Sequence, residues 1–208
     1  WADRLSINLE LPSNDSLKAY APEKDADSIT RAMGQMGERI AEAREETSRH
    51  AKSFAPAGQS TQVIVGADAT NDADMLKTSA KLYGRYGLSR VYYSAFSPIP
   101  SPSAALPAKP PPLQRENRLY QADWLYRYYG FGVDEIASGG EGGMLDLEID
   151  PKLAWALKHR GMFPVDVNTA DRQMLLRVPG LGVRAVDRIV EARRYARLRL
   201  EDVARVCA

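Results

Sequence analysis

Hydrophobic and polar residues alternate strictly along residues 5–11. Every second residue is apolar, and the positions between them are Ser6, Asn8 and Glu10. A period of two is typical of a β-strand with one apolar and one polar face. In an antiparallel sheet the polar face would contact solvent, whereas in an α/β barrel it would point into the mouth of the barrel.

The pattern that follows favours the barrel. Apolar residues at helical spacing predict a helix over about residues 25–52 and another over about residues 70–87. Residues 62–66 form a short apolar segment, and residues 90–96 are rich in β-forming residues. Strands that alternate with helices predict a parallel sheet with right-handed crossovers.

We therefore expect an α/β fold in which residues 1–112 form a partial parallel (β/α) barrel. Three strands do not close a barrel, so further strands of the same domain are expected upstream of Trp1. A small open sheet with an exposed edge is the alternative, although exposed edges favour unwanted pairing.

A proline-rich segment, residues 97–112, precedes a long helical pattern over residues 113–129. Tyr120, Trp124 and Tyr128 fall on one face of this predicted helix. Such a stripe is more typical of a core than of a surface that stacks on nucleic-acid bases, so we expect these rings to be buried.

The rest of the chain divides into a helical connector, residues 113–150, and a small all-α domain, residues 151–208. That domain is organised around the turn Val-Pro-Gly-Leu-Gly-Val at residues 178–183. Asn168 is a candidate cap for the helix before the turn, and Pro179 ends that helix. Two helices joined by a Pro-Gly-aliphatic-Gly turn resemble the helix-hairpin-helix of DNA-binding proteins.

The turn has the composition of an anion site. Gly180 and Gly182 both permit positive φ and let backbone N–H groups approach an anion without a Cβ in the way. The amides of Leu181, Gly182 and Val183, with the unpaired N–H groups of the second helix, predict a phosphate site. The structural alternative is a turn that uses glycine only to end a helix.

Basic charge is concentrated around this turn, although the whole chain has a formal net charge of only +1. The arginines of this stretch are Arg172, Arg177, Arg184, Arg188, Arg193, Arg194, Arg197 and Arg199. We expect Arg184 and Arg188 to contact phosphates beside the turn. A backbone site does not recognise bases, so the predicted partner is the DNA backbone, bound independently of sequence.

Composition narrows the remaining classes. The chain has 208 residues, of which 44% are hydrophobic and 26% charged, as expected of a globular protein with a real core. No apolar run approaches the length of a membrane span, so no membrane association is predicted. Cys207 is the single cysteine, which excludes an internal disulfide and a cysteine-only metal site within this chain and fits a cytoplasmic compartment. His50 and His159 are far apart in sequence, and no metal site is predicted.

Polar residues and a glycine follow the predicted strands, where parallel strands would bring them to one mouth. They are Asn8, Glu10, Gly66, Asp68 and Ser94. A carboxylate and an amide bind sugar hydroxyls, and Gly66 would admit a flat ring beside the backbone. These features define a binding site and leave the catalytic residues unassigned.

The same positions resemble a known family. Asn8-Leu9-Glu10 and Val63-Ile64-Val65-Gly66 resemble the fourth and fifth strands of radical S-adenosylmethionine (SAM) enzymes. The resemblance implies that Asn8 and Glu10 contact the ribose of SAM, and that Ile64 and Gly66 lie along its adenine.

Two longer segments are similar to one branch of that family, the radical SAM proteins assigned to DNA modification or repair. They are residues 115–125, Arg-Glu-Asn-Arg-Leu-Tyr-Gln-Ala-Asp-Trp-Leu, and residues 163–168, Phe-Pro-Val-Asp-Val-Asn. Members of this branch join a barrel to a C-terminal helix-hairpin-helix. The resemblance implies an enzyme that uses SAM and a 4Fe–4S cluster.

The sequence also departs from the family. The usual adenine-strand pattern is Gly-x-Ile-x-Gly-x-x-Glu, but Gln62 replaces its first glycine and Ala69 its acid. The cluster-binding Cys-x3-Cys-x2-Cys is absent; in the family it lies upstream of the region that this chain matches. The resemblance therefore implies that the chain is the C-terminal part of the enzyme and does not hold the cluster itself.

Two other functional classes remain open. One is a non-catalytic DNA-binding module in which the α/β part is a scaffold. The other is a base-excision glycosylase, which also carries the hairpin but requires a Gly-Pro-Asp loop and a catalytic acid about twenty residues later. Asp202 lies at that distance without the loop, so it is predicted to cap a helix.

Overall fold

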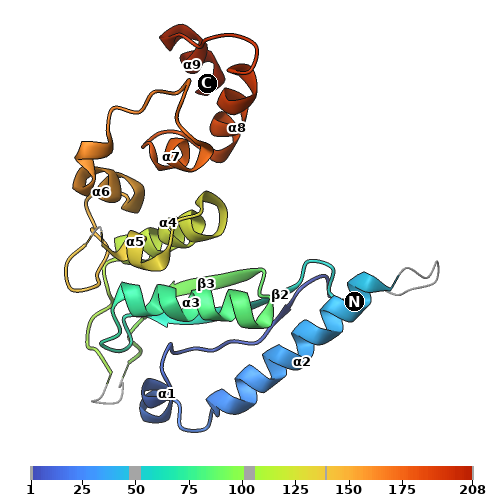
Figure 1. Ribbon diagram of the computed structural model, residues 1–208. Helices are drawn as coiled ribbons and strands as arrows, with labels where there is room; N and C mark the ends of the chain where they lie inside the picture. Colours follow the sequence, from blue (N-terminus) through green and yellow to red (C-terminus); the bar gives the residue numbers. More distant parts are fainter. Residues whose placement is uncertain (1, 47–52, 101–105, 139, 208) are drawn as a thin grey trace. The chain divides into compact units, whose positions relative to one another are not determined.

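The computed structural model describes residues 2–46, 53–100, 106–138 and 140–207, without the side chain of Cys207 (Figure 1). The chain forms two compact units, Trp1–Leu119 and Tyr120–Ala208. The boundary falls within helix α4 (Leu113–Tyr129), whose bounds agree with the prediction.

The first unit contains a three-stranded parallel sheet, which confirms the predicted α/β class and strand direction. Its strands are β1 (Leu5–Ser6), β2 (Gln59–Val65) and β3 (Arg90–Ala95), hydrogen-bonded in that order. The sheet is open within the described residues, and no strand there closes it into a barrel.

The described residues of the first unit also form three helices ahead of α4: α1 (Asn14–Tyr20), α2 (Ala26–Glu45) and α3 (Asp72–Tyr86). α2 and α3 were predicted, although α2 ends at Glu45 and not near residue 52. Each begins at a side-chain cap, Asp25 for α2 and Asn71 for α3. α1 was not predicted; it begins at Ser13, whose hydroxyl oxygen accepts the N–H of Ser16 at 3.1 Å.

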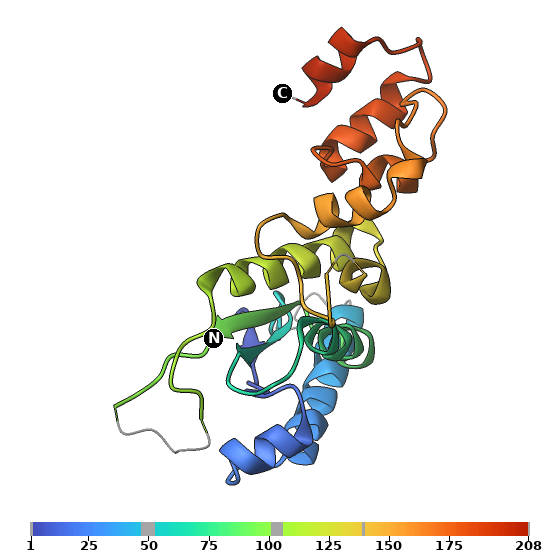
Figure 2. The same cartoon turned by 90° about the vertical axis from the view of Figure 1, so that its left-hand side faces the viewer.

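α2 and α3 cover the same face of the sheet. The Gln59 amide donates to the backbone carbonyls of Met33 in α2 and Tyr86 in α3, at 3.0 and 2.5 Å. The hydroxyl of Tyr93, on the same face of β3, donates to Ser79 of α3 at 2.8 Å. Figure 2 shows both helices on one side of the strands, as right-handed crossovers require.

The predicted continuous strand over residues 5–11 is wrong, although the burial alternates as expected. Regular pairing ends at Ser6, which aligns with Ser60, and the next pairing joins Glu10 to Val63. One extra residue on the first strand makes this a β-bulge. Glu10 accordingly has a φ of 68°, and the N–H of Leu9 donates to the hydroxyl of Thr61 at 2.9 Å.

The second unit is helical. After α4 come α5 (Val133–Ala137), α6 (Pro151–Lys158), a 3-10 turn (Arg160–Met162), α7 (Arg172–Arg177), α8 (Val183–Ala192) and α9 (Leu200–Cys207). Asp150 caps α6 by accepting the N–H groups of Lys152 and Leu153, both at 3.0 Å. None of the helices in the described part of the chain is long and apolar enough to cross a membrane.

The prediction that the aromatic stripe of α4 is buried is wrong. Leu119, Ala122 and Leu125 form its buried face, whereas Trp124 and Tyr128 are 51% and 47% exposed. The buried face of α4 therefore lies on nearly the opposite side of the helix from the aromatic stripe.

Candidate functional site

The hairpin turn stands on an apolar core formed by the helices on either side of it. Leu175 and Leu176 of α7, Leu181 of the turn, and Val186 and Ile189 of α8 are buried together. Packing of these side chains fixes the angle between the two helices, and therefore the position of the turn between them. The arrangement α7–turn–α8 agrees with the predicted helix-hairpin-helix.

The helix before the turn begins later than predicted. Asp171 caps α7 by accepting the N–H of Met174 at 2.6 Å, so the prediction that Asn168 is the cap is wrong. Asn168 instead makes two hydrogen bonds to the backbone of Leu198, at 2.8 and 3.1 Å, and ties the start of the domain to the segment after α8. Its own N–H donates to Asp166, which lowers the pKa of that carboxyl group.

The two glycines of the turn have different roles. Gly180 has a φ of 86°, a conformation that a residue with a side chain rarely adopts. Gly182 has a φ of −85° and caps α8, so the prediction that the turn uses positive φ holds for Gly180 alone. A Cβ built on Gly182 meets only the hydroxyl of Tyr129, at 3.7 Å, so this position has room for a side chain.

The backbone N–H groups of the turn also have two different roles. The N–H of Leu181 donates to the carbonyl of Val178 at 3.2 Å and so closes the turn. The prediction that this N–H faces a ligand is therefore wrong. The N–H groups of Gly182 and Val183 have no acceptor within the described residues. They open an α-helix of ten residues, where unpaired N–H groups and the helix dipole favour an anion.

Arg184 lies in the first turn of α8, directly after these amides, Arg188 lies one turn further along, and both are exposed. Arg184 makes no hydrogen bond or ion pair with the described residues, and Arg188 contacts only the carbonyl of Val206, at 3.4 Å. Their charges are therefore available to a ligand.

Other arginines of the basic stretch are structural. Arg177 makes two hydrogen bonds to Glu135, at 2.7 and 2.8 Å, and its guanidinium lies over the ring of Phe131. Arg193 donates to the carbonyls of Val167 and Ala170, at 3.0 and 2.6 Å. Fewer of these arginines are therefore available to a ligand than their number in the sequence suggests.

A further pair of exposed arginines is neutralised by acids nearby. Arg172 contacts Asp187 at 2.8 Å, and Arg194 contacts Glu191 at 3.1 Å. Both pairs are about half exposed, so each contributes little to stability.

A buried lysine supports the turn, and sequence analysis missed it. Lys152 of α6 is 8% exposed; its ammonium group donates to the carbonyl of Leu181 at 2.6 Å and lies over the ring of Tyr129. Burial lowers its pKa to about 8, although the nearby Asp150 carboxylate raises it. Nothing in the sequence distinguishes Lys152 from an ordinary surface lysine.

The second candidate region is the edge of the sheet where the strands end. Asn8 is exposed, and its side-chain oxygen accepts the hydroxyl of Ser6 at 3.1 Å. Glu10 pairs with Lys24 at 2.7 Å, with about a fifth of the Glu10 side chain exposed. The bulge brings both residues to this edge, but it leaves Glu10 already engaged in an ion pair.

Ile64 and Gly66 are also partly enclosed. Ile64 packs against the buried cluster of Leu11, Leu17 and Ala67. Gly66 has a φ of 78°, and a Cβ built on it would lie 2.8 Å from the ring of Pro111. A flat ligand on that side of Gly66 would therefore have to replace Pro111.

The acids near this edge are held by their own chain. Asp68 accepts the N–H and the hydroxyl of Thr70, at 3.0 and 2.9 Å, and the hydroxyl of Ser16. The fully buried Asp72 forms an ion pair with Arg115 of α4 at 2.7 Å. Sequence analysis missed this pair because its residues are far apart in the chain.

The face of the sheet away from α2 and α3 carries polar side chains, including Ser60, Gln62 and Ser94. The hydroxyl of Tyr92 accepts a hydrogen bond from Arg4 at 3.0 Å, and the guanidinium of Arg90 lies over its ring. Ser60 is buried, whereas Gln62, Tyr92 and Ser94 are partly exposed and could contact a polar ligand.

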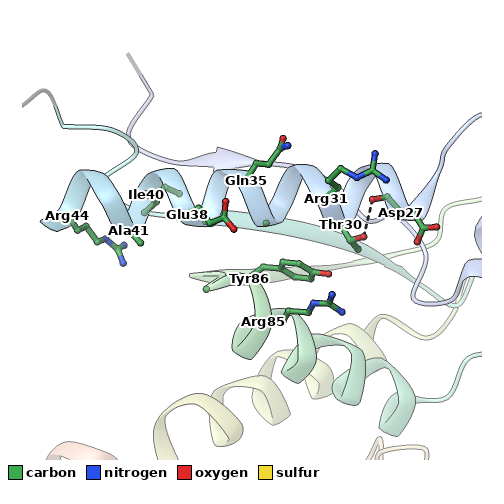
Figure 3. Close-up of a pocket in the computed structure, with 13 residues that line it drawn as sticks. Asp27, Thr30, Arg31, Gln35, Glu38, Ile40, Ala41, Arg44, Arg85 and Tyr86 are labelled. Carbon is green, nitrogen blue, oxygen red and sulfur yellow. Dashed lines mark hydrogen bonds between the residues drawn. The ribbon is translucent and has the colours of Figure 1, made fainter. Parts of the chain in front are cut away.

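An open groove of about 820 Å³ lies between α2 and α3. Gly37 lets the helices approach, since a Cβ there would lie 2.8 Å from the carbonyl oxygen of Tyr86. Figure 3 shows Tyr86 and Arg85 facing α2, while both acids and arginines line the groove. Charges of both signs give no indication of a ligand class.

No metal centre is indicated. The described residues contain no group of three or more histidine, cysteine or acidic side chains placed to hold a metal ion. His159 is structural, because it stacks on Trp155 with ring centroids 4.2 Å apart and its Nδ1 contacts the Trp155 carbonyl at 2.8 Å. His50 lies outside the described residues.

Comparison with known proteins does not assign the chain to a family. No family model matches it, and neither a curated protein nor a solved structure matches it significantly. The arguments for function therefore come from the sites themselves.

Proposed function

We propose that the chain binds the phosphate backbone of DNA, independently of base sequence, through the hairpin between α7 and α8. The observation that carries this proposal is the pair of unengaged amides, Gly182 and Val183, at the start of α8, with Arg184 and Arg188 beside them. Helix N-termini bind phosphate through such N–H groups, and arginine adds charge.

The hairpin predicts a weak, salt-dependent interaction. Contact with two to four phosphates gives a Kd on the order of 10⁻⁴–10⁻⁶ M at physiological salt, and a slope of log K against log salt of roughly −2 to −4. Fluorescence anisotropy with a labelled duplex at several salt concentrations measures both quantities.

Two variants test the site. Gly182→Val should abolish most of the binding, because its side chain would occupy the path of the phosphate to the amides. The fold has room for it, so thermal unfolding should be nearly unchanged. Arg184→Ala should flatten the salt slope by about one unit.

Arg194→Ala is the matched control, since it removes the same charge from the other end of α8, where Arg194 already pairs with Glu191. It should change the slope much less than Arg184→Ala. If Gly182→Val binds like the wild type at every salt concentration, the hairpin is structural and this proposal is wrong.

We further propose that this DNA-binding unit belongs to a radical SAM enzyme of DNA modification or repair, of which the chain is the C-terminal part. The parallel sheet, with a polar face and with Asn8, Glu10 and Gly66 at its edge, supports this interpretation. In it the sheet is part of a (β/α) barrel, Asn8 and Glu10 contact the ribose of SAM, and Ile64 and Gly66 lie along the adenine. The cysteines of the 4Fe–4S cluster would come from outside this chain.

The alternative is a non-catalytic DNA-binding module in which the sheet is a scaffold. Equilibrium dialysis with SAM distinguishes the radical SAM enzyme from the non-catalytic module. This chain alone should bind SAM poorly, whereas a longer, cluster-loaded protein should bind it well and lose roughly 10- to 100-fold in affinity on Glu10→Gln. Glu38→Gln, an exposed acid on α2, is the control. Equal binding by the chain and the longer protein, or no effect of Glu10→Gln, would contradict the SAM assignment.

A further inference from the structure

An exposed aromatic pair lies on α4 in the second unit. Trp124 and Tyr128 are 51% and 47% exposed, and their ring centroids are 4.6 Å apart. The guanidinium of Arg127 lies over both rings, 5.9 Å from the centroid of Trp124 and 4.8 Å from that of Tyr128. We call these three residues the aromatic platform.

The platform is held in place before any ligand binds. Arg127 donates to the carboxylate of Asp123 at 2.8 Å and to the hydroxyl of Tyr128 at 2.9 Å. Asp123 is 2% exposed, so it anchors Arg127 to the body of the unit. A surface whose side chains are already ordered pays less conformational entropy on binding.

Trp124 also forms one wall of a cavity of about 320 Å³. The other lining residues are Gln121, Leu125, Tyr129, Asp150, Pro151 and Lys152. This volume lies at the small end of the range for ligand sites and suits a single planar group. The cavity lies entirely within the second unit.

The cavity and the hairpin share two side chains. Lys152 lines the cavity and donates to the carbonyl of Leu181, and Tyr129 lines the cavity while its hydroxyl lies beside Gly182. A nucleotide whose phosphate binds at the start of α8 therefore has an aromatic wall and a cavity within the same small region.

We propose that the aromatic platform and this cavity bind an unstacked base of a single-stranded DNA segment whose phosphate lies at the hairpin. The inference rests on the proposed phosphate site and adds the kind of DNA that the site takes. The chemistry is complementary: aromatic rings stack on the face of any base, and Arg127 and Lys152 supply positive charge near a polyanion. Stacking tolerates every base, so no sequence preference is expected.

Anisotropy with two labelled single strands tests the inference on the full chain. One strand is oligothymidylate, and the other has the same phosphates but abasic sugars. The wild type should bind oligothymidylate more tightly, and Trp124→Ala should weaken that binding by about 5- to 150-fold while leaving the abasic strand unaffected. Trp124→Phe should retain most of the affinity.

Tyr195→Ala is the matched control, because Tyr195 is an aromatic residue of the same unit that is 82% exposed and away from the cavity. It should change neither affinity. Equal binding of both strands by the wild type, or no effect of Trp124→Ala, would overturn the platform while leaving the hairpin site in place.

The remaining outcomes are also decisive. If the wild type binds neither strand, both the platform and the hairpin proposal are wrong. If only oligothymidylate binds, and Trp124→Ala abolishes that binding, bases stack on Trp124 without a phosphate at the hairpin, so the hairpin proposal is wrong and the inference fails in the form stated here. If Trp124→Ala converts a dimer into a monomer in light scattering, the occupant of the platform is a second copy of the chain and the inference fails.

Discussion

The two candidate sites differ in whether their polar groups are already engaged. At the edge of the sheet, Glu10 pairs with Lys24, Asp72 pairs with Arg115, and Pro111 covers one side of Gly66. At the hairpin, the amides of Gly182 and Val183 have no acceptor within the described residues. A ligand of these two amides gains hydrogen bonds without breaking any, whereas a ligand of the sheet edge has to exchange existing contacts for its own.

The largest expected effect tests how firmly the sheet edge is held. Arg115→Met should lower the free energy of unfolding by about 3–5 kcal/mol, because it removes the guanidinium that pairs with the fully buried Asp72 carboxylate. Urea denaturation measures the change. Arg85→Met, at an exposed position of α3, is the control and should cost less than about 1 kcal/mol.

Removing both charges sharpens this test. Arg115→Met combined with Asp72→Leu should recover much of the lost stability, since the buried carboxylate is then removed together with the guanidinium that pairs with it. If Arg115→Met alone lowers the free energy of unfolding by less than about 1 kcal/mol, the pair contributes little to the stability of this edge. The difference between engaged groups at the sheet edge and unengaged groups at the hairpin would then be smaller than the contacts indicate.

A smaller effect tests the support of the hairpin. The pKa of Lys152 is about 8 in the folded chain, against 10.5 for an ordinary lysine. Between these two values the unfolded chain binds the proton and the folded chain does not, so stability should rise with pH by roughly 2–3 kcal/mol from this group. Below about pH 8 the group is charged in both states, and its contribution should not change with pH.

Urea denaturation of wild type and Lys152→Met between pH 7 and pH 10.5 isolates this contribution. The difference in unfolding free energy between the two proteins should move in favour of the wild type as pH rises. Parallel curves would show that Lys152 is not desolvated beneath the turn, and that the turn is less firmly supported than its contacts indicate.

The sequence predicted elements well where local signals agreed. The bounds of α4, the end of α3 and the parallel sheet all follow from helical spacing, turn residues and strand–helix alternation. α1 was missed because its few apolar residues give no clear period, although Ser13 supplied a cap. The bulge before Glu10 was missed because an alternating pattern carries no information on which backbone groups pair.

The candidate sites were predictable in position but not in detail. The glycine and arginine pattern located the hairpin, yet local conformation decided that Gly180 has positive φ while Gly182 does not. Lys152 and Arg115 were missed because their partners lie 29 and 43 residues away. The exposure of Trp124 depended on which face of α4 the core uses, and hydrophobicity alone favoured the wrong face.

The second unit also carries two tryptophans in opposite environments. Trp155 is 3% exposed and stacks on His159, whereas half of the Trp124 surface is exposed. The indole of Trp155 is thereby shielded from soluble quenchers such as iodide, and that of Trp124 is open to them. In the intrinsic fluorescence of this unit, Trp155 therefore reports on unfolding of the interior, whereas Trp124 reports on ligands that bind at the surface. Neither measurement requires a label.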